Sequence, residues 1–308
     1  MISVVVPVFN EAETLGALHQ RVTEVMQAIN MPFEMIFVDD GSTDNSLEIA
    51  LALHQEDKNA KVLELSRNFG HQMAIAAGLD YACGEAVITM DGDLQHPPEL
   101  IPALVEKWQE GYDVVLTLRQ GTAETGLLKD VSSRLFYGIV NSLSQVRIPA
   151  GAADFRLLDR KVVEVFRTLG ERALFHRGLV SWIGHRQAAI SYQAHARHSG
   201  KSKYSLSRML RFAVSGVTSF SSLPLYIAAF AGVVISALSF AYAAFAVYAR
   251  LFTDRVVEGW ASVLVAVLFL GGMQLIALGT HGAYLARIYD EVKGRPRYLV
   301  RQSYGFDE

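Results

Sequence analysis

Two long stretches of the chain contain no Asp, Glu, Lys or Arg, and they constrain its fold more than any other feature. They are Phe212–Ala249 and Trp260–Ala286. A helix needs about 20 apolar residues to cross the bilayer core, so each stretch predicts one transmembrane helix. We place these helices near Leu225–Tyr248 and Ala261–Leu285. The alternative is a pair of buried helices in a soluble core, which two such stretches separated only by Arg250–Gly259 disfavour.

Basic residues gather outside the two predicted spans. They are Arg197, Lys201, Lys203, Arg208 and Arg211 before the first span, and Arg287, Lys293, Arg295, Arg297 and Arg301 after the second. The loop between the spans holds only Arg250 and Arg255, beside Asp254 and Glu258. The positive-inside rule therefore predicts a multi-pass protein of the inner or plasma membrane with both termini in the cytoplasm. Met1–Val8 lacks the basic region of a signal peptide.

The sequence divides into four predicted segments. Residues 1–200 form a cytoplasmic domain, and residues 201–222 form an amphipathic helix at the membrane interface. In the second segment apolar side chains recur at helical spacing while Arg208 and Arg211 fall on another face. The alternative is an ordinary surface helix. Residues 223–286 hold the two spans, and residues 287–308 form a cytoplasmic C-terminal tail.

Strands and helices alternate through the first 120 residues. Five short apolar runs predict buried strands: Ser3–Val8, Met35–Val38, Val62–Leu65, Ala86–Met90 and Val114–Leu116. Helical periodicity lies between them, at Glu11–Ile29, Thr43–Leu53, His71–Ala82 and Pro98–Glu110. This alternation predicts an α/β fold with a doubly wound, mostly parallel sheet. Ligands bind such sheets beyond the carboxyl ends of the strands.

Polar clusters follow four of these strands, where a ligand site is expected. They are Pro7–Glu11, Asp39–Asp44, Ser66–Gly70 and Asp91–Gln95. Any one of them alone could be a helix-capping turn. Within the last cluster, Asp91 and Asp93 lie two residues apart and Gln95 can add a carbonyl oxygen. Oxygen ligands of this kind suit Mg²⁺ or Mn²⁺, with substrate phosphate oxygens completing the coordination.

Several classes of function are disfavoured by what the sequence lacks. It has neither the G-x-x-x-x-G-K-[ST] loop of NTPases nor a G-x-G-x-x-G after its first strand. A nucleoside diphosphate would therefore depend on the cation, which favours a nucleotide-sugar transferase. The net charge of −3 disfavours nucleic-acid binding. The single cysteine, Cys83, excludes a disulfide framework within the chain.

A second group of charged residues lies between the predicted sheet domain and the membrane. It includes Arg119, Arg134, Asp154, Arg156, Arg177 and the segment Arg197–Lys203. Arginine side chains bind phosphate through paired hydrogen bonds, so this group is a candidate site for a lipid phosphate. The alternative is a set of solvated surface arginines.

The ordered set of motifs resembles the polyprenyl-phosphate glycosyltransferases of glycosyltransferase family 2, such as dolichyl-phosphate mannose synthases and bacterial undecaprenyl-phosphate glucosyltransferases. The resemblance covers nearly the whole chain. It rests on the four polar clusters with their flanking residues, then on Asp154–Asp159, Gly216–Ser221, the two spans and Glu291–Tyr298. It implies a GT-A fold. His96 stands where an aspartate is frequent in this family.

The resemblance also implies roles for individual residues. Nucleotide-sugar contacts would come from Pro7, Phe9, Glu11, Asp40, Arg67 and Asp91, and metal ligands from Asp91, Asp93 and Gln95. Acceptor-phosphate contacts would come from Arg119, Arg134 and Arg197, while Asp154 would lie near the donor sugar and the acceptor, for positioning or for proton removal. Asp93, Asp154 and the three arginines form the expected catalytic set.

The expected reaction is metal-dependent, inverting transfer of a hexose to a membrane polyprenyl phosphate. UDP-glucose is the first candidate donor and undecaprenyl phosphate the first candidate acceptor; other nucleotide sugars stay open. A homo-oligomer is expected for such a small anchor. Two alternatives remain: a processive polysaccharide synthase, and a non-catalytic membrane scaffold or flippase subunit with a nucleotide pocket. The first usually carries Gln-x-x-Arg-Trp, which Arg177–Trp182 does not match.

Overall fold

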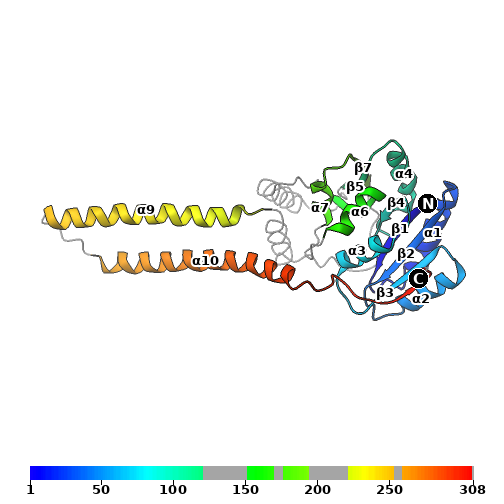
Figure 1. Ribbon diagram of the computed structural model, residues 1–308, viewed down its shortest axis with the longest axis horizontal. Helices are drawn as coiled ribbons and strands as arrows, with labels where there is room; N and C mark the ends of the chain where they lie inside the picture. The colour runs from blue at the N-terminus through cyan, green and yellow to red at the C-terminus, as the bar shows by residue number, and fades with distance from the viewer. Residues whose placement is uncertain (121–150, 170–175, 194–220, 253–258, 307–308) are drawn as a thin grey trace.

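The computed structural model describes residues 1–120, 151–169, 176–193, 221–252 and 259–306. These residues form an α/β domain from which two long helices project side by side (Figure 1). Both marked ends of the chain lie within the α/β domain. The chain therefore leaves this domain, runs out and back along the two helices, and returns to it.

A single eight-stranded sheet forms the centre of the α/β domain. Its strands are β1 Ile2–Val8, β2 Phe33–Asp39, β3 Ala60–Leu65, β4 Ala86–Thr89, β5 Val114–Gln120, β6 Ala152–Asp159, β7 Gln187–Gln193 and β8 Val300–Tyr304. Their order across the sheet is β7-β5-β6-β4-β1-β2-β3-β8. The four central strands β3, β2, β1 and β4 are parallel, whereas β6 and β8 run antiparallel to their neighbours.

Helices cover both faces of the sheet. One face packs against α1 Leu15–Ala28, α2 Ser46–Glu56 and α4 Ile101–Gln109. The short 3₁₀ helix η1 Pro98–Leu100 precedes α4. The other face packs against α3 His71–Tyr81, α6 Arg160–Thr168 and α7 His176–Trp182. Every residue of β1 is buried, with Val4 and Val6 in one layer of the core and Val5 in the other. Such two-sided burial explains why valine and isoleucine make up most of this strand on both of its faces.

The predicted α/β fold with its mostly parallel sheet is confirmed, and all five predicted strands are present. The predicted helices are present too, with boundaries a few residues from those expected. The sequence analysis did not foresee β6, β7 or β8. Because β6 is antiparallel to β4, its first residues lie at the edge of the sheet where β4 ends.

The two projecting helices match the predicted apolar spans. They are α9 Leu223–Phe252 and α10 Trp260–Val292, and both are long and apolar enough to cross a membrane. Large apolar side chains such as Phe230 and Leu275 are exposed along them. The Tyr284 hydroxyl of α10 donates to the carbonyl oxygen of Ser221 at 2.6 Å, which joins the base of the pair. The predicted interface helix falls almost entirely outside the described residues.

The C-terminal strand β8 brings the chain back into the sheet after α10. Its pairing with β3 is reinforced by Arg301, which donates to Glu64 Oε1 at 2.7 Å and to the carbonyl oxygen of Ser66 at 3.1 Å. The amide of Ser66 donates to the carbonyl oxygen of Leu299 at 2.8 Å. The segment expected to be a tail is thus part of the eight-stranded sheet, beside the loop that follows β3.

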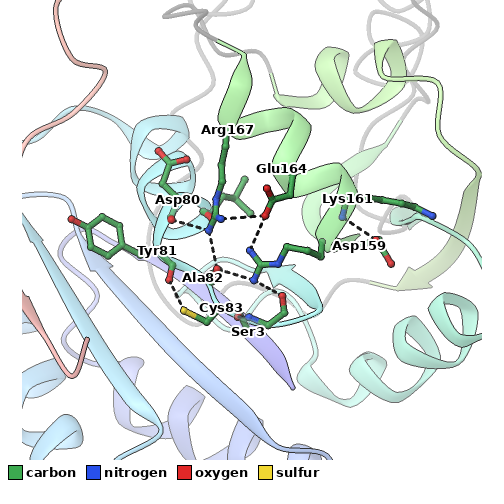
Figure 2. A network of polar contacts seen from close by, with 12 residues as sticks. Ser3, Asp80, Tyr81, Ala82, Cys83, Asp159, Lys161, Glu164 and Arg167 are labelled. Carbon is green, nitrogen blue, oxygen red and sulfur yellow. Dashed lines mark hydrogen bonds and ion pairs between the residues drawn. The ribbon is translucent and has the colours of Figure 1, made fainter. Parts of the chain in front are cut away.

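Helix α3 is fixed at both its middle and its end. A Cβ at Gly78 would lie 2.1 Å from Cγ1 of Val5, so only glycine lets the helix approach β1 this closely. At the end of α3, Arg167 of α6 donates to the carbonyl oxygens of Leu79, Asp80 and Ala82 at 2.8 to 3.0 Å (Figure 2). These carbonyls lack helical partners, and a cation is favourable at a helix C-terminus.

We expect Arg167→Ala to destabilise the α/β domain by about 2 kcal/mol, because several charge-assisted hydrogen bonds to buried carbonyls are lost together. The measurement is thermal unfolding of the purified protein followed by circular dichroism. Arg21→Ala is the matched control. It removes an exposed pair with Glu99, which is worth less than about 1 kcal/mol. Equal melting temperatures for the two variants would contradict the proposed capping of α3.

A buried carboxylate joins β2 to its neighbours close to the end of α3. Glu34 accepts from the Ser3 hydroxyl at 2.5 Å, from the Cys83 amide at 2.7 Å, and pairs with Lys61 at 2.8 Å. Burial alone would raise the pKa of Glu34, but the bonds from Lys61, Ser3 and Cys83 outweigh it and lower the pKa. The ionised form is therefore bound more tightly in the folded state than in the unfolded state.

This lowered pKa makes a part of the stability depend on pH. The contribution of Glu34 is present above its unfolded pKa of 4.5 and is lost as the pH falls through the lower folded value. We expect the wild-type protein to lose more stability than Glu34→Gln on acidification below pH 4.5. Unfolding free energies at neutral and acidic pH test this. Parallel pH profiles for the two proteins would refute it.

Candidate active site

The loops after β1 and β2 are joined by hydrogen bonds at the carboxyl edge of the sheet. The side-chain oxygen of Asn10 accepts from the backbone amide of Thr43 at 2.8 Å. The backbone amide of Asn10 donates to the Ser42 hydroxyl at 3.1 Å. Asn10 has a positive φ of 57°, which asparagine tolerates better than most residues. The amide of Glu11 donates to the Ser46 hydroxyl at 2.9 Å. Two of the four predicted polar clusters therefore form one surface.

Asp40 joins the loops after β2 and β3. Its carboxylate accepts from the amides of Phe69 at 2.6 Å and Gly70 at 2.9 Å. Burial raises the pKa of Asp40, although these two bonds and the nearby His71 act in the opposite direction. The next residue, Gly41, has a φ of 68°, and a Cβ there would lie 2.7 Å from the Asn68 nitrogen. Asp40, expected to contact the nucleotide, thus anchors the loop that leads into α3.

The other residues expected to contact the nucleotide border the same surface. Pro7 is buried at the end of β1, while Phe9 just beyond it is 46% exposed. Arg67 is exposed; its guanidinium lies over the Phe69 ring at 4.0 Å and donates to the Asn68 carbonyl. An exposed aromatic ring at a strand end is a suitable surface for a planar base.

Asp91 lies just after β4 with its carboxylate between two histidines. His71 Nε2 is 3.4 Å from Asp91 Oδ1, and His96 Nδ1 is 3.7 Å from Asp91 Oδ2. The Asp91 amide donates to His96 Nδ1 at 3.2 Å, and the buried His96 ring stacks on Phe155. Asp91 Oδ1 is buried and has no hydrogen-bond partner among the described residues. His96 therefore supports Asp91 from the core side.

The turn around Asp93 has an unusual backbone. Leu94 has a φ of 59°, in the left-handed region that a leucine seldom occupies. Asp93 Oδ1 accepts from the Gln95 amide at 3.1 Å, and Gln95 Oε1 accepts from Arg119 Nη1 at 3.3 Å. Strain of this kind is often found at functional sites. Arg119 of β5 therefore contacts the turn that holds Asp91, Asp93 and Gln95, which we call the acidic turn. Arg134 and Arg197 fall outside the described residues.

The donor set of this turn suits a divalent cation bound together with a substrate. Asp91, Asp93 and Gln95 offer only oxygen atoms, and Asp91 Oδ1 is a buried oxygen without a hydrogen-bond donor in the described part of the chain. In that part, no three His, Cys, Asp or Glu residues are grouped as a metal site. The residues present therefore fit Mg²⁺ or Mn²⁺ only if substrate oxygens complete the coordination.

Asp154 enters the site from β6, which the sequence analysis had not recognised as a strand. Its side chain is nearly buried and pairs through Oδ1 with the guanidinium of Arg156 two residues further on. Oδ2 lies 3.4 Å from Nε2 of Gln72 and 3.7 Å from Nε2 of His71. Asp154 and Asp91 both lie within 4 Å of His71 Nε2, so these two predicted site residues do come together.

Two residues near the site were missed by the sequence analysis. His71 directly follows the Ser66–Gly70 cluster, a signal that could have suggested it. Tyr192 of β7 is 6% exposed. Burial, together with Asp91 and Asp93, raises the pKa of Tyr192 to about 12, while Arg119 lowers it. No motif in the sequence marks Tyr192.

The segment that carries this site matches a known family. Residues 3–166, from β1 to α6, match the model described as Glycosyl transferase family 2. The chain belongs to this family. It is a glycosyltransferase, and the resemblance identified from the motifs is confirmed.

Relatives of this glycosyltransferase extend over its full length. It is 43% identical over 305 residues to an uncharacterized glycosyltransferase of Bacillus subtilis (strain 168), covering 99% of this chain and 94% of the relative. It is 41% identical over 303 residues to the SfII prophage-derived bactoprenol glucosyl transferase of Shigella flexneri, covering 98% of both chains. A prophage bactoprenol glucosyl transferase homolog of Escherichia coli (strain K12) is 39% identical over 301 residues, with 98% of both chains covered.

Solved structures agree on the fold of the glycosyltransferase. Mannosyl-3-phosphoglycerate synthase from Rubrobacter xylanophilus superposes with a TM-score of 0.52, covering 71% of this chain and 73% of the other. The two sequences are only 16% identical, so the likeness concerns the fold alone. The predicted GT-A fold is confirmed.

Proposed function

We propose that this glycosyltransferase transfers glucose from UDP-glucose to a polyprenyl phosphate, with undecaprenyl phosphate as the first candidate acceptor. The observation that carries the proposal is the likeness to bactoprenol glucosyl transferases over 98% of both chains, which includes the two apolar helices as well as the catalytic domain. Likeness confined to the catalytic domain would not indicate which acceptor the enzyme uses.

The acidic turn would bind the nucleotide-sugar donor. Asp91 and Asp93 would hold Mg²⁺ or Mn²⁺ with the donor's diphosphate, and the bound cation would act as a Lewis acid that stabilises the leaving nucleoside diphosphate. Pro7, Phe9, Glu11 and Arg67 surround the place for the nucleotide. Asp40 supports this place indirectly, because it fixes the loop that contains Phe69 and Gly70.

The acceptor needs little help from a general base. A phosphate monoester has a second pKa near 6, so the acceptor oxygen is already an anion at neutral pH and can attack the anomeric carbon. Arg119, with Arg134 and Arg197, would offset the repulsion between the two anionic substrates. Asp154 would orient the sugar, since its pairing with Arg156 favours a fixed carboxylate. A single displacement inverts the anomeric centre.

The two apolar helices would place the site beside the lipid. We propose that α9 and α10 cross the membrane with both chain ends in the cytoplasm, where nucleotide sugars are made. Strand β8 follows α10 after only a short connection, Lys293–Leu299, so the sheet is tied closely to the base of the helix pair. An acceptor phosphate at the membrane surface could then reach the carboxyl edge of the sheet.

A donor panel tests the proposed reaction. The purified protein in detergent with undecaprenyl phosphate and Mn²⁺ is offered radiolabelled UDP-glucose, UDP-N-acetylglucosamine or GDP-mannose. We expect UDP-glucose to give the largest lipid-extractable label, together with free UDP. Label in a water-soluble polymer would indicate a processive synthase instead. No transfer and no nucleotide release with any donor would favour the scaffold alternative.

A further inference from the structure

His71 lies close to two acidic groups but has no role in the reaction outlined above. It is the first residue of α3, and the loop before it is fixed because Asp40 accepts from the amides of Phe69 and Gly70. The rest of α3 is fixed by the close contact of Gly78 with Val5 and by the bonds from Arg167. The position of the imidazole is therefore set by the fold and not by a mobile loop.

One nitrogen of the imidazole lies near two carboxylates, one just after β4 and the other on β6. This nitrogen, Nε2, is 3.4 Å from Asp91 Oδ1 and 3.7 Å from Asp154 Oδ2. The other oxygen of Asp154 pairs with Arg156, so Oδ2 is the oxygen turned toward the site. The His71 side chain is 43% exposed, which leaves it accessible to substrate. It is therefore close both to Asp91, which is proposed to bind the cation and the donor, and to Asp154, which is proposed to orient the sugar.

We propose that His71 is a positioning residue, which keeps the Asp91 and Asp154 carboxylates in a fixed relation so that the donor diphosphate and the reacting sugar are aligned. Two carboxylates that both lie within 4 Å of one nitrogen repel each other. The imidazole Nε2, when it carries a hydrogen, offsets this repulsion. The inference deepens the proposed function, since it assigns a residue to the same site.

The other site histidine acts differently, which separates its contribution from that of His71. His96 accepts from the Asp91 amide and is stacked in the core on Phe155. A matched control is His185, whose Nδ1 lies 3.2 Å from Asp113. This pair precedes β7 and β5, at the opposite end of those strands from Arg119 and Tyr192.

The test compares Mn²⁺ binding and turnover in three variants. His71→Ala should weaken Mn²⁺ binding in the presence of UDP, measured by electron paramagnetic resonance, and lower kcat, each by about tenfold or more, as found for residues that orient metal ligands. His71→Gln, whose amide can place an N–H near the Nε2 position, should restore most of both. His185→Ala should match the wild type. KM for UDP-glucose should change less than kcat.

A double-mutant cycle tests whether His71 acts through Asp154. In an Asp154→Asn background, His71→Ala should lower turnover by less than about twofold, because residues that act as a unit are not additive. Full additivity, or Mn²⁺ affinity and kcat of His71→Ala within twofold of wild type, would overturn the inference. Failure of the proposed function is seen separately, as a wild-type protein that makes no glucosylated lipid.

Discussion

Asp93→Asn is expected to reduce glucosyl transfer at least about a thousandfold while the protein still folds. The substitution keeps the size of the side chain but removes the charge that would bind the cation, and charge stabilisation of this kind is usually the largest catalytic contribution. Asp93 Oδ1 also accepts from the Gln95 amide, and an asparagine oxygen can do the same. The measurement is the initial rate of lipid-linked product formation, with circular dichroism to verify folding.

The control for this prediction is Asp57→Asn. Asp57 precedes β3, at the edge of the sheet opposite to the site, and its carboxylate contacts His19 at 3.0 Å. We expect its turnover to equal that of the wild type. Substantial activity of Asp93→Asn, or undiminished wild-type activity in excess EDTA, would show that the acidic turn does not act through a cation.

Removal of the C-terminal strand should be nearly as damaging, but through stability. Ending the chain at Arg297 removes β8 with its pairing to β3, the Arg301–Glu64 contact, and the bond from the Tyr298 hydroxyl to Asp80 at 2.7 Å. We expect a loss of about 5 kcal/mol from these hydrogen bonds and the buried contacts, or a melting temperature lower by roughly 10 °C or more. The Ser66–Gly70 loop after β3 would also lose the hydrogen bond from the Ser66 amide to the Leu299 carbonyl oxygen.

A milder variant covers the case in which the shortened chain does not fold. Tyr298→Phe removes only the hydrogen bond to Asp80, and it should cost about 1 kcal/mol. Leu299→Ala serves as its control, since the Leu299 side chain is exposed and its carbonyl bond to Ser66 is retained. If the shortened chain melted within about 2 °C of the full-length protein, β8 would not be a structural part of the sheet.

The predictable parts of the fold were those with a strong local pattern. Valine-rich runs such as Ser3–Val8 mark strands that are buried on both faces, and the polar clusters after them follow from the parallel topology. β6 was missed because Asp154 and Arg156 interrupt its apolar character. These charges are tolerated in a buried strand because they pair with each other.

The unpredicted parts depend on contacts between distant segments. β8 is a short edge strand with polar residues such as Arg301 and Gln302, and only its pairing with β3 makes it a strand. His71 was recognised as the start of a helix, but its approach to Asp91 and Asp154 requires α3, β4 and β6 together. The roles of Arg134 and Arg197 remain predictions from the sequence.

The most direct test of the central proposal is the mass of the reaction product. The purified enzyme, undecaprenyl phosphate, UDP-glucose and Mn²⁺ are incubated, and the lipid extract is analysed by mass spectrometry. The proposal predicts a new species equal in mass to undecaprenyl phosphate plus one hexosyl residue, which Asp93→Asn does not form. Unchanged undecaprenyl phosphate with the wild-type enzyme, or a series of products carrying many hexoses, would contradict it.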